Sequence, residues 1–286
     1  MTRQLKFIAT VIATALLATL ISSSTEAKPA KKRLLVVTWT TGFRHADTIG
    51  TPDKDGPAQA ILKEIGDSSG VYDVDYCRDQ ADVTAMLTPG GLKKYDGVIF
   101  ANTTGNLHIP DLHAFLDWIK AGHAFIGTHS AGDTYHPADA GGDTGYIDMV
   151  AAEFRTHGAQ AEVDCIVEDP KHPAVAHLAP DLKVKDEIYH YKVNNRLNVH
   201  VLLALKTQGM DGVKDPVTNL DNSGKPIDML ISWCKIYGKG KVFYTALGHR
   251  PDVWSNPKYQ QHLLGGIKWA LGLAKGDATP QASSGR

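Results

Sequence analysis

The chain has 286 residues, of which 30 are basic and 31 acidic, so its formal net charge is −1. This balance gives no electrostatic reason to expect nucleic acid or an anionic membrane surface as a partner. The length suits one large α/β domain, and neither a repeat nor a linker marks a second domain.

The first 27 residues resemble a secretory signal peptide. Arg3 and Lys6 precede an apolar stretch from Phe7 to Ile21, and Thr25-Glu26-Ala27 resembles a small-residue cleavage site. The apolar stretch is shorter than the roughly 20 residues of a membrane span, although an uncleaved anchor is the alternative. We therefore expect a secreted or periplasmic mature protein without a membrane segment.

The first half of the chain alternates strand-like and helix-like segments. Continuous apolar runs predict buried strands at 34–37, 97–101 and 124–126, and the alternation of apolar and acidic residues at 72–76 predicts a half-buried strand toward the edge of the sheet. Helical patterns begin at Gly56-Pro57 and at Pro110. This alternation with short connections predicts an α/β fold with a doubly wound, mostly parallel sheet. Such sheets bind ligands beyond the carboxyl ends of their strands.

The second half of the chain is more irregular. A loop over the site is expected at 133–146 and a helix at 147–154. The pattern then predicts a long polar loop at 210–226, a hairpin around Tyr237 to Gly240, a helix through 263–269 and a polar tail over 274–286. Further strands are expected at 161–167, 187–192, 199–205, 229–236 and 242–247.

The three cysteines, Cys77, Cys165 and Cys234, are far apart and lack any C-x-x-C spacing. This argues against a zinc–thiolate site or a disulfide framework. One disulfide could form after export, but each cysteine lies in or beside an apolar strand pattern. We therefore expect buried, inert thiols.

The stretch around His129 has the pattern of a nucleophile elbow. A buried strand ends at Ile126, and the small residues Gly127 and Ala131 flank a sharp reversal, as in the Gly-x-Ser-x-Gly motif. The residue at the apex is His129, and an imidazole is a poor covalent nucleophile but a good metal ligand or proton carrier. The alternative is a β-turn whose histidine only caps the following backbone.

Three histidines follow three different strands. His45, His129 and His249 are all expected at the edge of the sheet where ligands bind. Three imidazoles with one open position form the arrangement of a catalytic zinc or a similar divalent ion. Because the chain has 13 histidines, three unconnected polar residues in a wet cleft are the alternative.

Two charged residues are candidates for catalysis. Arg44 is next to His45 in a loop that should face the cleft, where it could hold a substrate oxygen or a developing enolate. A salt bridge to a loop carboxylate is its alternative role. Glu187 could be a general base or a partner to a histidine, or it could be an ordinary strand residue that faces water.

Four further residues are candidates for substrate binding. Asp133 could contact substrate, ligate metal or orient His129, or it could cap the following segment. Tyr135, Tyr189 and Trp254 could supply flat apolar faces for a sugar ring, although aromatic residues more often have a structural role.

Five segments together resemble the trehalose-utilisation (ThuA-like) family, and the resemblance extends over about residues 33–273. They are Gly42-Phe43-Arg44-His45, Gly127-Thr128-His129-Ser130-Ala131, His172-Pro173, Asp186-Glu187-Ile188-Tyr189 and Tyr244-Thr245-Ala246-Leu247-Gly248-His249. The resemblance implies the class I glutamine amidotransferase-like superfamily and its flavodoxin-like sheet. Amidotransferases carry cysteine at the elbow, with a histidine and a glutamate from later in the chain. Since His129 occupies the apex here and no cysteine falls nearby, glutamine hydrolysis is excluded.

The resemblance also implies sugar catabolism, because members of the family are associated with 3-keto derivatives of glycosides. A ketone at C3 makes the C2 hydrogen acidic, so a base can remove it while a metal or Arg44 stabilises the enolate and the C1 group leaves. We therefore expect a lyase or hydrolase that binds a divalent metal and no nucleotide cofactor, with His129, Glu187 and Arg44 as catalytic residues. A non-catalytic periplasmic carbohydrate-binding protein and a metal-dependent ester or amide hydrolase are the alternatives.

Overall fold

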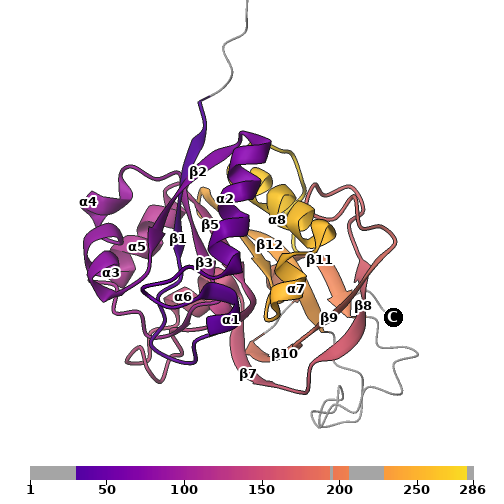
Figure 1. Ribbon diagram of the computed structural model, residues 1–286, viewed down its shortest axis with the longest axis horizontal. Helices are drawn as coiled ribbons and strands as arrows, with labels where there is room; N and C mark the ends of the chain where they lie inside the picture. Colours follow the sequence, from indigo (N-terminus) through magenta and orange to yellow (C-terminus); the bar gives the residue numbers. More distant parts are fainter. Residues whose placement is uncertain (1–29, 194–195, 206–228, 282–286) are drawn as a thin grey trace, which may run out of the picture. The chain divides into compact units, whose positions relative to one another are not determined.

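The computed structural model describes residues 30–193, 196–205 and 229–281. The expected signal peptide, the loop 210–226 and the end of the polar tail (282–286) lie outside these residues. From Lys31 onward the described residues belong to one compact unit with a large central sheet (Figure 1). Its nine strands follow the order β2 (Tyr72–Cys77), β1 (Lys32–Val37), β3 (Gly97–Ala101), β5 (Ala124–Thr128), β13 (Gly240–Thr245), β12 (Leu230–Tyr237), β11 (His200–Leu205), β8 (Ala161–Val167) and β9 (Asp181–Asp186).

The sheet has a parallel part and an antiparallel part. Strands β2, β1, β3, β5 and β13 pair in parallel. Strands β12, β11, β8 and β9 continue the sheet in antiparallel pairs, and β12 and β13 form the predicted hairpin. The predicted α/β class with a large sheet built on parallel strands is confirmed, whereas the finer flavodoxin-like arrangement stays a prediction.

Helices cover both faces of the parallel part, which explains why its strands are continuously apolar. Along β1, Leu34 and Val36 belong to one hydrophobic cluster, and Leu35 and Val37 to a second cluster on the opposite face. The first cluster includes residues of α2 (Pro57–Ser69), α7 (Pro251–Trp254) and α8 (Pro257–Ala270), and Figure 1 shows α2 and α8 on the same side of the sheet. The second includes residues of α3 (Gln80–Met86), α4 (Pro89–Leu92), α5 (Leu112–Lys120) and α6 (Gly145–Val150).

The structure departs from the predicted elements mainly between residues 133 and 190. The expected helix 147–154 is wrong at its end, because Ala151 takes a left-handed conformation (φ 60°) that ends α6. Phe154 then lies in β7 (Glu153–His157), which pairs with β10 (Tyr189–Val193) in a separate two-stranded sheet. Strand β9 was not expected, because its sequence DLKVKD has only two apolar residues.

The short elements complete the frame of the site. Helix α1 (Ala46–Ile49) follows the loop after β1, and the two-residue strands β4 (Thr104–Gly105) and β6 (Asp133–Thr134) pair with each other. A 3-10 turn, η1 (His129–Gly132), follows β5 directly, and a second, η2 (Arg196–Asn198), precedes β11. Within the described residues, none of the helices combines the length and the apolar character that a membrane span requires.

The cysteines are buried and free, as expected for inert thiols. Cys77, Cys165 and Cys234 form no disulfide. Burial raises the pKa of all three thiols above the usual range, so the reactive thiolate is disfavoured.

Candidate metal centre

His129 lies at the sharp reversal that the sequence predicts. It is the first residue of η1, directly after β5, and its φ of 43° is in the left-handed region. Gly127 has no room for a side chain, since a Cβ there would lie 2.7 Å from the Tyr244 ring. An elbow would present its apex side chain openly, but the His129 side chain is fully buried. The Tyr189 ring, centred 4.2 Å away, helps to cover it.

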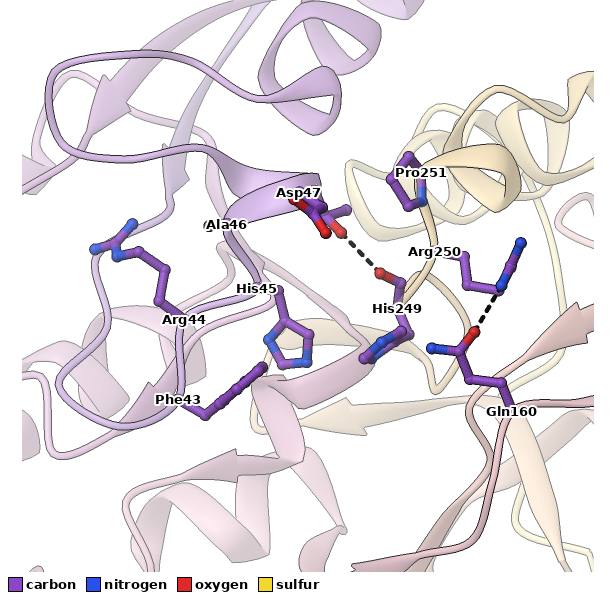
Figure 2. A pocket seen from close by; sticks show the side chains of 10 residues that line it. Phe43, Arg44, His45, Ala46, Asp47, Gln160, His249, Arg250 and Pro251 are labelled. Carbon is purple, nitrogen blue, oxygen red and sulfur yellow. Dashed lines mark hydrogen bonds between the residues drawn. The ribbon is translucent and has the colours of Figure 1, made fainter.

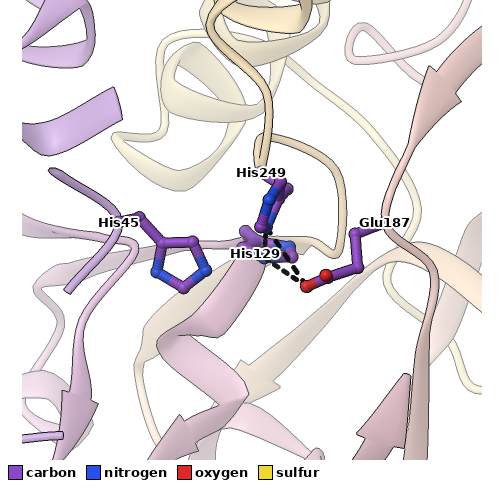
Figure 3. Close-up of side chains that lie close together, drawn as sticks. All are labelled: His45, His129, Glu187 and His249. Carbon is purple, nitrogen blue, oxygen red and sulfur yellow. Dashed lines mark hydrogen bonds and ion pairs between the residues drawn. The ribbon is translucent and has the colours of Figure 1, made fainter. Parts of the chain in front are cut away.

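Four side chains converge at this point: His45, His129, Glu187 and His249 (Figure 3). His129 Nε2 lies 3.2 Å from His249 Nδ1 and 3.5 Å from Glu187 Oε2. His249 Nδ1 lies 3.1 Å from the same Glu187 oxygen. One ligand atom from each of the four residues lies within 4.8 Å of all the others. The wider spacing therefore involves His45.

The spacing of these atoms matches the geometry of a bound metal ion. Zinc ligands lie about 2.0–2.1 Å from the ion, and two corners of such a tetrahedron are about 3.4 Å apart. The three closest donor atoms are 3.1, 3.2 and 3.5 Å apart. The donor set, imidazole nitrogen and carboxylate oxygen, also suits zinc and similar divalent ions. The residues therefore fit one divalent ion.

Hydrogen bonds from a surrounding layer orient these donors. His129 Nδ1 donates to the Ala246 carbonyl at 3.0 Å, which leaves Nε2 with its lone pair toward the cluster. The buried Asp186 carboxylate accepts from the backbone N–H of Glu187 at 3.0 Å and of Gly248 at 2.7 Å. One side chain thus fixes the backbone beside two donors, Glu187 and His249. Such supporting bonds are typical of metal sites.

The electrostatics favour the metal-binding protonation form at His45 and Glu187, but not at His249. Burial, followed by the neighbouring His129 and His249, lowers the pKa of His45 to about 3. Burial alone would raise the pKa of Glu187, but the hydrogen bonds and charges of His129 and His249 outweigh it and lower the pKa. The centre therefore combines neutral imidazole at His45 with an ionised carboxylate at Glu187. These are the forms in which both groups bind metal. Burial lowers the pKa of His249, but the hydrogen bond and charge of Glu187 outweigh it and raise the pKa, so an ion there would displace a proton.

Two of the sequence-predicted site residues point elsewhere. The Arg44 guanidinium donates to the backbone carbonyls of Thr38 and Gly50 at 3.3 and 3.4 Å. Figure 2 shows its side chain directed away from His45. The Asp133 carboxylate contacts His136 Nε2 at 2.6 Å. The expectation that Arg44 faces the cluster is therefore not met, because its Nη1 is bonded to two backbone carbonyls on the other side of the loop.

The predicted aromatic platforms are buried. Trp254 is fully buried and donates from Nε1 to the Gly248 carbonyl. Tyr135 is 3 % exposed, and its hydroxyl accepts from the backbone N–H of Ile109. Tyr189 does lie against His129, but only 5 % of it is exposed. In the described structure, none of the three offers an open face to a sugar ring.

Sequence reasoning missed two residues that contact the donors or their backbone. His157 Nδ1 lies 3.1 Å from Glu187 Oε1, the carboxylate oxygen that does not face the other donors. No motif marked it, because its segment was not expected to be a strand. Asp186 belongs to the Asp-Glu-Ile-Tyr segment, but no role was assigned to it from the sequence. Its position next to the candidate Glu187 could have indicated that it supports the site.

Comparison with known families adds an independent observation. Residues 33–270 match the model of the ThuA family, which is described as trehalose utilisation. The chain belongs to the ThuA family. This confirms the resemblance inferred from the sequence motifs. A search of curated proteins gave no match for this ThuA-family chain.

Solved structures share the fold of this ThuA-family protein. A ThuA-like protein from Bacteroides uniformis aligns with a TM-score of 0.65 at 19% identity, over 86% of this chain and 94% of that one. A ThuA-like protein from Parabacteroides merdae gives 0.60 at 17% identity, over 84% and 90% of the two chains. A cytoplasmic protein from Salmonella typhimurium gives 0.56 at 13% identity, over 84% and 98%. At these identities the similarity establishes the fold alone.

Proposed function

We propose that this protein is an exported carbohydrate-catabolism enzyme that cleaves a 3-keto glycoside with the help of a divalent metal ion. The observation that carries the proposal is the triangle of His129 Nε2, His249 Nδ1 and Glu187 Oε2, with sides of 3.1–3.5 Å. Three donors at this spacing suit one ion, and two histidines with one glutamate are a known ligand set of catalytic zinc. The family's description, trehalose utilisation, supports a sugar substrate.

The four residues of the cluster have different roles in this proposal. His129, Glu187 and His249 would hold the ion, while Asp186 and the Ala246 carbonyl keep them in position. His45 accounts for the widest spacing in the cluster and lines the adjoining pocket. We assign His45 the proton transfer. Arg44, whose guanidinium lies elsewhere, has no role in it.

The reaction we propose is an elimination that needs no oxidant. A bound ion would act as a Lewis acid and polarise the C3 ketone. His45 takes the proton from C2, and the electrons of that bond form a C1–C2 double bond conjugated with the ketone. The bond from C1 to its oxygen substituent breaks, and the departing oxygen takes up a proton. Burial of the cluster keeps bulk water away and strengthens these charge interactions.

Elemental analysis of the purified protein, followed by an assay with 3-keto-trehalose, tests the proposal. We expect about one equivalent of a divalent ion, turnover that stops with a chelator, and recovery when the ion is returned. Undiminished turnover in metal-free protein would contradict the metal role. Saccharide binding without turnover would instead favour the carbohydrate-binding alternative. Cleavage of simple esters or amides but not of the keto sugar would favour the hydrolase.

Export is a separate part of the proposal, supported by the charged start, the apolar run and the Thr-Glu-Ala end of the first 27 residues. We expect protein recovered from the exported fraction to begin after Ala27. The check is intact-mass measurement of that fraction. A mass that includes residues 1–27 would show that the segment is retained.

A further inference from the structure

A pocket of about 330 Å³ adjoins the metal cluster, which is at the small end of the range for small-molecule sites. Three segments form it: residues 43–48, which run from the loop after β1 into α1, Gln160 between β7 and β8, and residues 249–251, which run from the loop after β13 into α7. His45 and His249 belong both to its wall and to the cluster. A ligand in this pocket would therefore contact the cluster directly.

Phe43 stands out on one side of the pocket because its ring is exposed. Its exposed fraction is 68 %, the highest of any large hydrophobic residue in the described part of the chain. The ring packs edge-on against His45, with centroids 4.9 Å apart and planes at 84°. Its backbone is held in place, since the Phe43 carbonyl accepts from Thr104 Oγ1 at 2.9 Å. A fixed backbone thus presents an aromatic ring to solvent beside the metal cluster.

The other side of the pocket carries hydrogen-bond donors. The Arg250 guanidinium is held by both oxygens of Asp252 at 2.8 and 3.1 Å, and it donates to Gln160 Oε1 at 2.6 Å. Because the Gln160 oxygen is engaged, its amide nitrogen remains for a ligand. Figure 2 shows Phe43 on one side, Gln160 and Arg250 on the other, and His45 and His249 between them.

This combination matches the two surfaces of a pyranose ring. A sugar ring has an apolar C–H face that packs on aromatic rings, and hydroxyl oxygens at its edge that accept from amide and guanidinium N–H groups. We propose that the pocket is the sugar-ring subsite, with Phe43 as the stacking platform and Gln160 and Arg250 as the hydroxyl-binding pair. This inference rests on the proposed function only for the reacting end of the sugar. Ring binding itself requires no turnover.

Isothermal titration of the metal-loaded protein with trehalose tests the subsite, with the linear alcohol mannitol as a ligand that lacks a ring face. We expect Phe43→Ala to weaken trehalose binding by about threefold to tenfold, the size of one aromatic stacking contact. Phe43→Trp should restore it. Leu273→Ala is the matched control, because Leu273 is also exposed (50 %) but does not line the pocket. Metal content should be the same in all variants.

The outcomes separate this inference from the proposed function. Equal trehalose affinity in wild type and Phe43→Ala, or no trehalose binding by the wild type, would overturn the subsite. If Phe43→Ala weakens trehalose binding but no keto glycoside is cleaved, the subsite is supported and the proposed reaction is contradicted. If cleavage occurs, Phe43→Ala should raise KM with little change in kcat, since the platform holds substrate and transition state alike.

Discussion

Two groups of buried or half-buried histidines lie in the described part of the chain, and of these two only one has its ring nitrogens directed toward a common point. The first group comprises His45, His129 and His249, which meet Glu187. The second comprises His172, His200 and His262, beside β11, α8 and the C-terminal segment. Their exposed fractions are similarly low, from 0 to 6 % for five of the six. Burial of an imidazole therefore does not by itself indicate a site.

The difference between the two groups is in where the ring nitrogens point. In the second group the ring nitrogens have separate partners: His262 Nδ1 donates to the Ala174 carbonyl at 2.9 Å, and His172 Nδ1 accepts from the Ala174 N–H at 3.2 Å. His200 bonds the Thr279 carbonyl and Asp169. In the first group His129 Nε2 and His249 Nδ1 lie within 3.5 Å of each other and of Glu187 Oε2. The convergence of ligand atoms on one point thus distinguishes a candidate metal site from histidines that are buried for structural reasons.

The largest expected effect comes from replacing a donor of the first group. His129→Gln should lose the bound ion and lower turnover by more than about 100-fold, because a Lewis acid contributes several kcal/mol to such a step. His262→Gln is the matched control from the second group and should keep its metal. Elemental analysis and the keto-glycoside assay measure both. An equal metal content in the two variants would break the comparison between the groups.

The next largest effect should come from the layer behind the donors. Asp186→Asn cannot accept from both the Glu187 and Gly248 N–H groups as the carboxylate does. We expect metal affinity to fall by about 10-fold to 100-fold, as is usual when such supporting partners are removed. Asp169→Asn is the control, since Asp169 supports His200 in the second group. The metal affinity of both variants can be measured by competition titration with a metal indicator. Wild-type affinity in Asp186→Asn would contradict the supporting role of Asp186.

The second group should contribute to how stability depends on pH, as should His45 of the first group, whose pKa burial also lowers. Burial lowers the pKa of His262 from its usual 6.5 to about 3, and that of His172 to about 4. Both therefore stabilise the fold fully above pH 6.5, and this stability is lost as the pH falls, because only the unfolded chain then takes up protons. The free energy of unfolding should therefore fall between about pH 7 and pH 5.5, and replacing His262 with Gln should make that fall smaller by about 1.2 kcal/mol. Urea unfolding at the two pH values measures it, and an unchanged difference would contradict the prediction.

The smallest effect should come from Ser130, the neighbour of the apex histidine. Its Oγ lies 3.4 Å from His45 Nδ1, which is long for a hydrogen bond. Ser130→Ala should therefore change turnover by less than about threefold and leave the metal content unchanged. The measurement is steady-state kinetics with the keto glycoside. A much larger change would be seen if Ser130 acted as the nucleophile of a hydrolase. In that case turnover would be abolished.

The sequence predicted the parallel part of the fold better than the rest, for a physical reason. Strands covered on both faces must be continuously apolar, so β1, β3 and β5 were visible as short hydrophobic runs. Strand order then placed His45, His129 and His249 at one edge of the sheet. Strands such as β9 and β7 have mixed composition, and their pairing depends on contacts distant in sequence.

Only those site residues that follow the ends of predictable strands could be found from the sequence. The three histidines were found because each lies in the segment that follows a parallel strand. The position of Glu187 could not be derived, since it lies between β9 and β10, which belong to different sheets. Side-chain direction was also inaccessible: nothing in the sequence indicated that Arg44 turns to the Thr38 carbonyl or that Phe43 stays exposed.

The contact between Thr48 and the His249 carbonyl joins residues 201 positions apart and holds the two ends of the site together. No fragment that stops before Gly248 could carry the three-donor triangle, and a growing chain would complete it only near the end of its synthesis. An ion would therefore be acquired after nearly the whole chain has folded. Since proteins often select among divalent metals by what the surroundings supply, the compartment in which folding finishes would decide which ion is bound.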